Sequence, residues 1–93
     1  MEIRIENISQ TENGVSYISL STEKHNIEVV IRKGETYLAP VTVANRNASS
    51  RAWNRQFSAG KDFNSVEEAI ANYKTATIKE MIKVAAEIAE IAA

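Results

Sequence analysis

The stretch GKDFNSVEEAIANY (residues 60–73) marks the change from strand to helix in this chain. Ser65, followed three residues later by Glu68, forms a capping box, in which the serine oxygen accepts a hydrogen bond from the amide of Glu68. Phe63 lies close to the position of a hydrophobic staple residue. Apolar residues then recur at helical spacing, at Val66, Ala69, Ile70, Tyr73, Met81, Ile82, Ala85, Ile88 and Ala89. This pattern predicts a helical region over residues 63–92.

The length of that region raises a packing question. An unbroken helix over residues 66–92 would be about 40 Å long, whereas a small domain is about 30 Å across. Either the helix breaks or kinks near Thr75–Thr77, or its alanine- and isoleucine-rich end (residues 85–93) packs on another subunit. The pattern favours a homo-oligomer.

The preceding residues, 1–60, read as strands. Apolar and polar residues alternate from Ile3 and again from Val15 to Leu20, and Asn13-Gly14 between them is a favoured pair for a tight hairpin. Residues 27–32 are rich in β-branched side chains, which favour a third strand.

Two further strands are expected, over residues 37–43 and from Arg51 to about Ala59. Pro40 cannot donate to a ladder, so the first of these lies at an edge or begins after the proline. The prediction is an α+β fold in a single domain (residues 1–93), with an antiparallel sheet of about four to five strands followed by a long C-terminal helix that could be kinked.

Composition narrows the function classes. The 93 residues include no cysteine and one histidine, His25, so thiolate metal sites, disulfides and a histidine-driven catalytic triad find no support. No run of about 18 apolar residues predicts a membrane span, and the N-terminus lacks a secretory pattern. We expect a cytoplasmic, non-catalytic protein without a cofactor or bound metal, and we interpret His25 as a solvated loop residue.

Charge is distributed unevenly along the chain. Residues 1–30 carry two basic and five acidic side chains, residues 31–61 six basic and one acidic, and residues 62–93 three basic and six acidic. The central third is therefore basic, although the whole chain has a net charge of −1. Such a centre favours an anionic ligand held locally; the alternative is that the three segments neutralise one another on folding.

The candidate binding residues lie in this basic centre. On a strand, Arg51, Trp53, Arg55 and Phe57 would share one face. Alternating arginines and aromatic rings suit a ligand with flat bases and phosphates. Alternatively, Trp53 and Phe57 belong to the core, with the arginine stems lying over them.

Other cations could complete or replace this site. Arg46, Lys61 and Phe63 could close around the same anion. Arg32-Lys33-Gly34, a glycine turn with two cations, is a second candidate. No carboxylate pair, nucleophile with a base, or phosphate-binding loop predicts catalysis.

Part of the chain resembles plant AP2 and phage-integrase arm-type DNA-binding domains. The resemblance rests on residues 60–73, where a strand ends at a glycine and a phenylalanine and a helix opens with serine, two glutamates and an alanine. It covers residues 37–78 at most. It implies sheet-mediated binding of duplex DNA through the same arginines.

A second set of features comprises Tyr37-Leu38-Ala39-Pro40-Val41, the basic loop, and Tyr73-Lys74 followed by Ile78-Lys79-Glu80-Met81-Ile82. In these features the chain resembles small phage proteins of the anti-Thoeris signal-sponge family. This resemblance implies a homo-oligomer in the host cytoplasm that sequesters a cyclic nucleotide or ADP-ribose-type signal without cleaving it. A third hypothesis is a protein-interaction inhibitor of a bacterial defence complex, which would use the acidic helix or the apolar C-terminal end.

Overall fold

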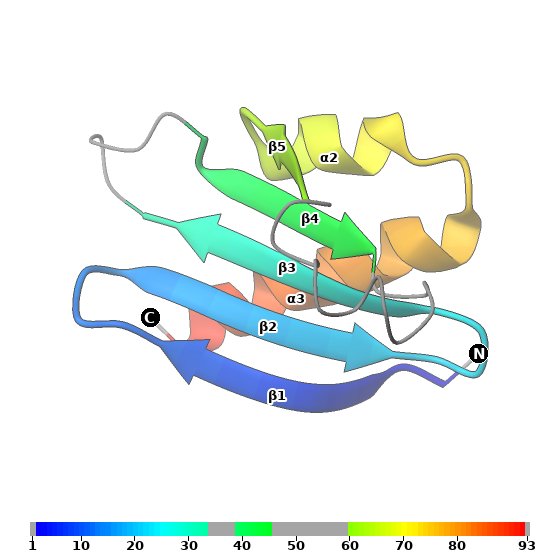
Figure 1. Cartoon of the computed structure of the whole chain (residues 1–93), viewed down its shortest axis with the longest axis horizontal. Helices are drawn as coiled ribbons and strands as arrows, with labels where there is room; N and C mark the ends of the chain where they lie inside the picture. The colour runs from blue at the N-terminus through cyan, green and yellow to red at the C-terminus, as the bar shows by residue number, and fades with distance from the viewer. Residues whose placement is uncertain (1, 34–38, 46–59, 93) are drawn as a thin grey trace.

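The computed structural model describes residues 2–33, 39–45 and 60–92. They form a five-stranded antiparallel sheet with two helices on one face (Figure 1). The sheet order β1-β2-β3-β4-β5 follows the chain. The elements are β1 (Arg4–Gln10), β2 (Val15–Ser21), β3 (Asn26–Arg32), β4 (Val41–Asn45), β5 (Lys61–Phe63), α2 (Val66–Asn72) and α3 (Ala76–Ala92). The predicted α+β class, with the sheet before the helices, is confirmed.

The β1–β2 hairpin closes through Thr11–Gly14, at the predicted Asn13-Gly14 pair. Thr11 N donates to Val15 O at 2.9 Å, and Gly14 N donates to Thr11 O at 3.2 Å. Gly14 has φ +84°, whereas Asn13 stays at negative φ, so the turn needs only one residue in the left-handed region. Lys33 N donates to Gly14 O at 3.0 Å, which ties the hairpin to the end of β3.

Gly14→Ala is expected to destabilise the fold by about 1–2 kcal/mol, because a side chain at positive φ is strained. The added Cβ would also lie 3.1 Å from Lys33 O, a backbone atom that cannot move aside easily. Urea denaturation measures the loss. Asn13→Ala is the matched control in the same turn and should change stability by less than half as much. Equal losses in the two variants would contradict the conclusion that Gly14 is the residue of this turn that requires positive φ.

The strands after β3 depart from the sequence prediction in two places, the first being that β4 ends at Asn45 and not at Val43. β4 begins after Pro40, as one of the two predicted alternatives has it, and Pro40 O accepts from Arg32 N at 2.8 Å. β5 was not predicted; it pairs with β4 through Val41↔Phe63. The predicted strand from Arg51 to Ala59 lies outside the described residues.

The first helix, α2, begins as the capping box predicts. Ser65 Oγ accepts from Glu68 N at 3.0 Å, while the Glu68 carboxylate accepts from Asn64 N. The helical region is divided: Tyr73 is extended (φ −94°, ψ 141°), and α3 starts at Ala76. The structure therefore has two helices where the sequence predicted one long helix, kinked or broken near Thr75–Thr77. Lys79 Nζ donates to Ile70 O at 2.9 Å, which links α3 to the end of α2.

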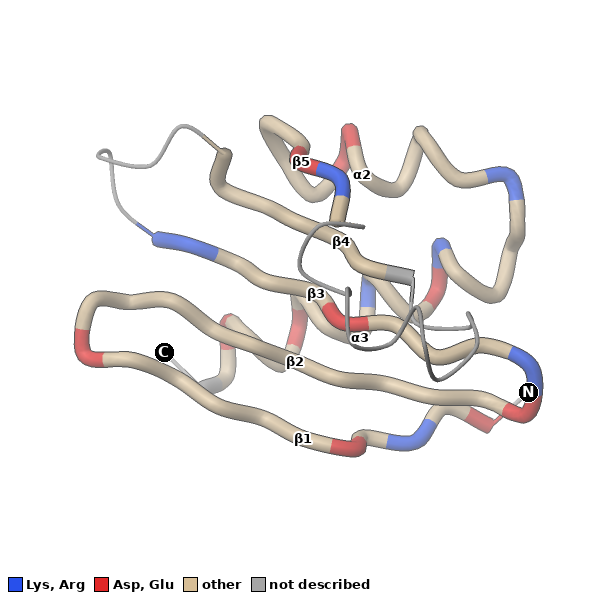
Figure 2. The backbone as a smooth tube through the Cα atoms, in the orientation of Figure 1, with Lys and Arg blue, Asp and Glu red and all other residues tan. Residues whose placement is uncertain are grey.

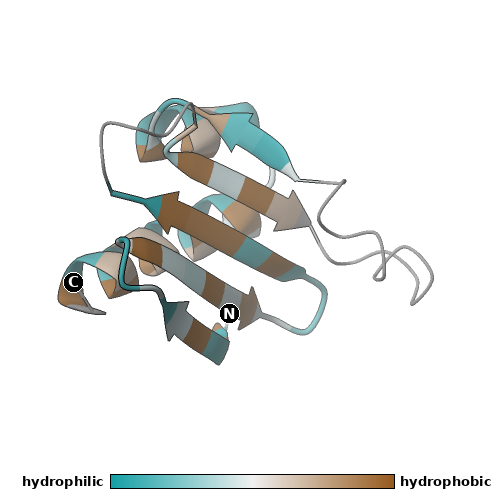
Figure 3. Cartoon of the chain, turned by 60° about the vertical axis from the view of Figure 1, so that its left-hand side comes forward, coloured by the Kyte–Doolittle hydropathy of each residue, from teal (hydrophilic) through white to brown (hydrophobic). Residues whose placement is uncertain are grey.

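The hydrophobic core lies between the sheet and α3. Ile18 and Leu20 of β2 and Ile27 of β3 are fully buried, as are Met81 and Ile82 of α3. Phe63 and Tyr73 close the core beside α2 with an edge-on ring contact at 6.1 Å. Hydrophobic residues predominate in β3 and β4 and alternate with serines in β2, whereas β5 is mostly hydrophilic (Figure 3). Among the described residues, no helix has the length and apolar character needed to cross a membrane.

Tyr73 gives the fold an alkaline pH dependence. Burial raises the pKa of its hydroxyl. The folded state therefore holds this proton more tightly, so its contribution to stability is full below about pH 10 and is lost as pH rises through the folded pKa. Tyr73→Phe should lose less stability than the parent protein between about pH 8 and pH 11 in urea denaturation. Equal losses in the two proteins would contradict this role.

Candidate functional site

Most of the predicted binding residues lie outside the described part of the chain. These are Gly34, Arg46, Arg51, Trp53, Arg55 and Phe57. The stretch 46–59 follows Asn45, the last residue of β4, and precedes Gly60, which lies just before β5. The positions of its two neighbours in the fold therefore show where this arginine- and aromatic-rich stretch is attached.

Those attachment points share one end of the sheet with the β2–β3 turn. Asn45 is paired with Ile27, and Ser21, the last residue of β2, is paired with both Asn26 and Arg4. The start of β1, residues 21–26 and the end of β4 thus lie together (Figure 1). We call this end of the sheet the turn end. Lys61 is paired with Val43, two residues before Asn45.

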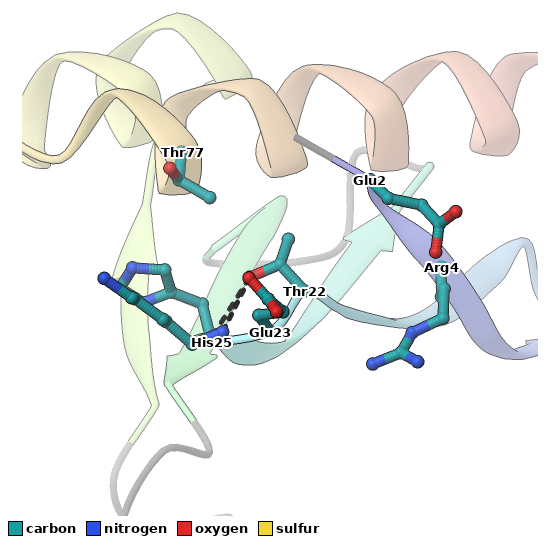
Figure 4. A pocket seen from close by; sticks show the side chains of 7 residues that line it. Glu2, Arg4, Thr22, Glu23, His25 and Thr77 are labelled. Carbon is teal, nitrogen blue, oxygen red and sulfur yellow. Dashed lines mark hydrogen bonds between the residues drawn. The ribbon is translucent and has the colours of Figure 1, made fainter.

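Two adjoining depressions lie at the turn end, and we call them together the turn-end site. Their volumes are about 490 and 620 Å³, within the range of about 300–1,000 Å³ usual for small-molecule pockets. Both are lined by Arg4, Thr22, Glu23, Lys24 and His25. Glu2 and Thr77 complete the first (Figure 4), and residues from the first three strands, including Glu6, Ser19 and Ser21, complete the second.

The β2–β3 turn is held by Thr22. Thr22 N donates to His25 O at 2.8 Å, and Thr22 Oγ1 accepts from His25 N at 3.1 Å and from Lys24 N at 3.4 Å (Figure 4). These bonds fix the backbone that carries two basic side chains. His25 lies in this loop, as the sequence predicted, and it is half-buried and lines the site.

The charges at the turn-end site are mixed. Arg4 and Lys24 stand beside the carboxylates of Glu2, Glu6 and Glu23, and both basic and acidic positions occur at this end of the sheet (Figure 2). Ser21 Oγ donates to a Glu6 carboxylate oxygen, which fixes that side chain. Thr77 belongs to the first turn of α3, which carries no acidic residue. The partial positive charge of this helix N-terminus is therefore not offset by an acidic side chain in its first turn.

Arg32 and Lys33 do not form one anion site. Arg32 Nη1 donates to Ala39 O at 3.0 Å and to Thr42 Oγ1 at 2.7 Å, and Thr42 Oγ1 donates to Asp62 Oδ1 at 2.7 Å. Lys33 Nζ instead donates to Ala89 O at 3.3 Å, near the C-terminus of α3. A cation there favours the helix dipole, so the contacts of Lys33 are those of a structural residue.

Lys61 and Phe63, the two predicted binding residues in β5, also lie in different surroundings. Phe63 is 7% exposed and belongs to the core, so we do not retain its ring in the binding surface. Lys61 is exposed and lines a shallow depression with Asp62, Asn64 and Glu68. These carboxylates compete with a bound anion at that depression.

Sequence reasoning missed the turn-end site because its members are far apart in the chain. Arg4 and Lys24 are separated by 19 residues, and Thr77 lies 52 residues after His25. Only the register of β1 on β2 and the position of α3 bring them together. No local motif marks them.

We found no match to this chain among protein family models, curated proteins or solved structures.

Proposed function

We propose that the protein binds a small phosphate-bearing nucleotide, of the cyclic-nucleotide or ADP-ribose type, and sequesters it without catalysis. One observation carries the proposal: the stretch with Arg46, Arg51, Trp53 and Arg55 is attached at the sheet end that holds the turn-end site. In this proposal the two sets of basic side chains act on the same ligand. Arg32 and Lys33 are not part of it.

The mixed charge of the turn-end site suits such a ligand. Arginine and lysine bind phosphate oxygens through charge-assisted hydrogen bonds, and carboxylates accept hydrogen bonds from ribose hydroxyls. The N-terminus of α3 adds a favourable potential for negative charge. A ligand that carries both phosphates and sugar hydroxyls uses both kinds of group, whereas a purely anionic ligand would meet repulsion from the three glutamates.

Duplex DNA fits the described surface less well. We call the sheet face opposite the helices the open face. Its described ionisable side chains include Arg4 and Arg32 but also Glu6, Glu28 and Asp62. A surface that binds the DNA backbone is usually a basic patch or stripe. Sheet-mediated DNA binding is therefore the less supported alternative.

In this proposal the biological role is that of a sponge for an immune signal in a bacterial host. The resemblance to the anti-Thoeris proteins implies that role, and we assign the turn-end site as the place where the signal binds. In sequestration the protein holds the ligand without cleaving it, so the ligand should be recovered unchanged when the protein is denatured.

Isothermal titration calorimetry with cyclic ADP-ribose isomers and cyclic dinucleotides, each in turn, tests the proposal. At least one should bind with a stoichiometry of one or fewer per chain, and chromatography after denaturation should recover it intact. Failure of every nucleotide to bind would contradict the proposal. Recovery of a cleaved product would contradict the non-catalytic role. Capture of a host protein that nucleotides do not affect would favour the interaction-inhibitor hypothesis.

A further inference from the structure

β1 lies at the edge of the sheet, and all seven of its residues are exposed. Its inner side pairs with β2, and no described strand pairs with its outer side. An edge strand of this kind presents a row of backbone donors and acceptors that a further strand can use. The question is whether its side chains define a partner.

The helix-side face of β1 is apolar and uncovered. Ile5 is paired with Leu20 and Ile8 with Ile18, both fully buried beneath the helices. Directly paired residues share a face of the sheet, so Ile5 and Ile8 extend the core outward. α3 packs on β2 and β3 and leaves them 54% and 46% exposed.

The order in which the side chains of β1 occupy the two faces of the sheet is the same whether the strand is read forwards or backwards. A register shift between Ile5 and Asn7 interrupts the regular alternation. Asn7 lies opposite Ser19 on the open face, and Glu6 accepts a hydrogen bond from Ser21 on the same face. Between residues 4 and 9, Ile5 and Ile8 therefore lie on the helix side, and the four other residues lie on the open face.

We propose that β1 pairs antiparallel with β1 of a second copy of this chain, about a two-fold axis between Glu6 and Asn7. Such a copy sets Ile5 opposite Ile8 of the second chain and Ile8 opposite its Ile5. Every polar residue from Arg4 to Ser9 then meets a polar residue on the open face. A two-fold interface must be self-complementary, and this register meets that condition at each of the six positions.

The same pairing brings the second copy to the turn-end site. Arg4, Glu6 and Asn7 line that site, and they would lie opposite Ser9, Asn7 and Glu6 of the second copy. The interface is inferred from β1 alone, so it does not depend on the identity of the ligand. It also differs from the C-terminal interface that the sequence suggested.

Cysteine cross-linking tests the register, because the chain has no cysteine of its own. Ile5→Cys and Ile8→Cys proteins, mixed and oxidised gently, should give a covalent heterodimer, since opposite Cβ atoms lie about 4.5–5.5 Å apart. Either variant oxidised alone should give little dimer, because like positions are offset along the strands. A mixture of Ile5→Cys and Ile91→Cys is the matched control, since Ile91 is 85% exposed but lies at the end of α3. Equal cross-linking in all mixtures would overturn the proposal.

Light scattering of the unlinked protein is the second measurement. The parent should have an even multiple of the 10.3 kDa chain mass, and Ile8→Lys should halve it while the protein stays folded by circular dichroism. A monomeric parent would overturn the proposal. So would a mass that Ile91→Lys halves and Ile8→Lys leaves unchanged, since that result would place the interface on α3.

Discussion

Ile18→Ala is expected to destabilise the protein by about 2–5 kcal/mol, the usual cost of removing a large aliphatic side chain from a packed core. Ile18 is fully buried in β2 and lies in the cluster that joins the sheet to Met81 and Ile82. Since domains of this size have total stabilities of about 5–15 kcal/mol, this loss is a large share of the whole. Thermal and urea denaturation measure it.

Ile91→Ala is the matched control for this prediction. It removes the same atoms from a side chain that is 85% exposed, so stability should change by about 0.5 kcal/mol or less. A loss below about 1 kcal/mol for Ile18→Ala, or similar losses at the two positions, would contradict the register that directs Ile18 toward α3.

The second large effect concerns ligand binding. Arg55→Ala is expected to lower affinity for the nucleotide at least a hundredfold, because the proposal pairs this arginine with a ligand phosphate and the loss of one partner of such a charge pair costs about 2–5 kcal/mol. Calorimetric titration measures the loss. The unfolding temperature without ligand should stay within about 2 °C of the parent, as expected of an arginine that contributes to binding and not to folding stability.

Lys83→Ala is its control, since Lys83 is an exposed cation on α3 away from the turn-end site. Removing it changes the net charge of the protein by the same amount as Arg55→Ala. Affinity should fall less than threefold. Unchanged affinity in Arg55→Ala would remove that arginine from the proposed site, and equal losses in both variants would indicate a nonspecific charge effect.

Local signals in the sequence were sufficient for most of the fold. The alternating residues of β2, the β-branched run of β3 and the Ser65–Glu68 capping box each specify an element through neighbours in the chain. β5 was missed because it has only three residues, two of them exposed, and no alternation can be read over so short a run. It exists because its backbone pairs with β4, which is a tertiary effect.

The division of the helical region could be predicted only as an alternative. Thr75 and Thr77 interrupt the apolar stripe, but the break falls at residues 73–75, where Tyr73 packs against Phe63. The sequence carries no signal for that ring contact. The length argument was sound: α3, with 17 residues, is about 25 Å long and spans the sheet without projecting far beyond it.

The candidate site was less accessible from sequence than the fold. Charge counting located the basic centre of the chain, and Arg51, Trp53 and Arg55 within it remain a prediction. It could not show that Arg32 and Lys33 diverge to opposite faces of the sheet, because that depends on which carbonyl each side chain reaches. Nor could it associate Arg4 with Lys24, which only strand register brings together.

Thermal unfolding with a ligand panel tests the central claim most directly. The purified protein is heated with cyclic ADP-ribose isomers, cyclic dinucleotides or short duplex DNA, each at about 50 and 200 mM salt. The account predicts that one small nucleotide raises the unfolding temperature at both salt concentrations. At a hundredfold excess over the dissociation constant, the stabilisation is about 2.7 kcal/mol. A shift with DNA alone that disappears at the higher salt, or no shift with any nucleotide, would contradict the claim.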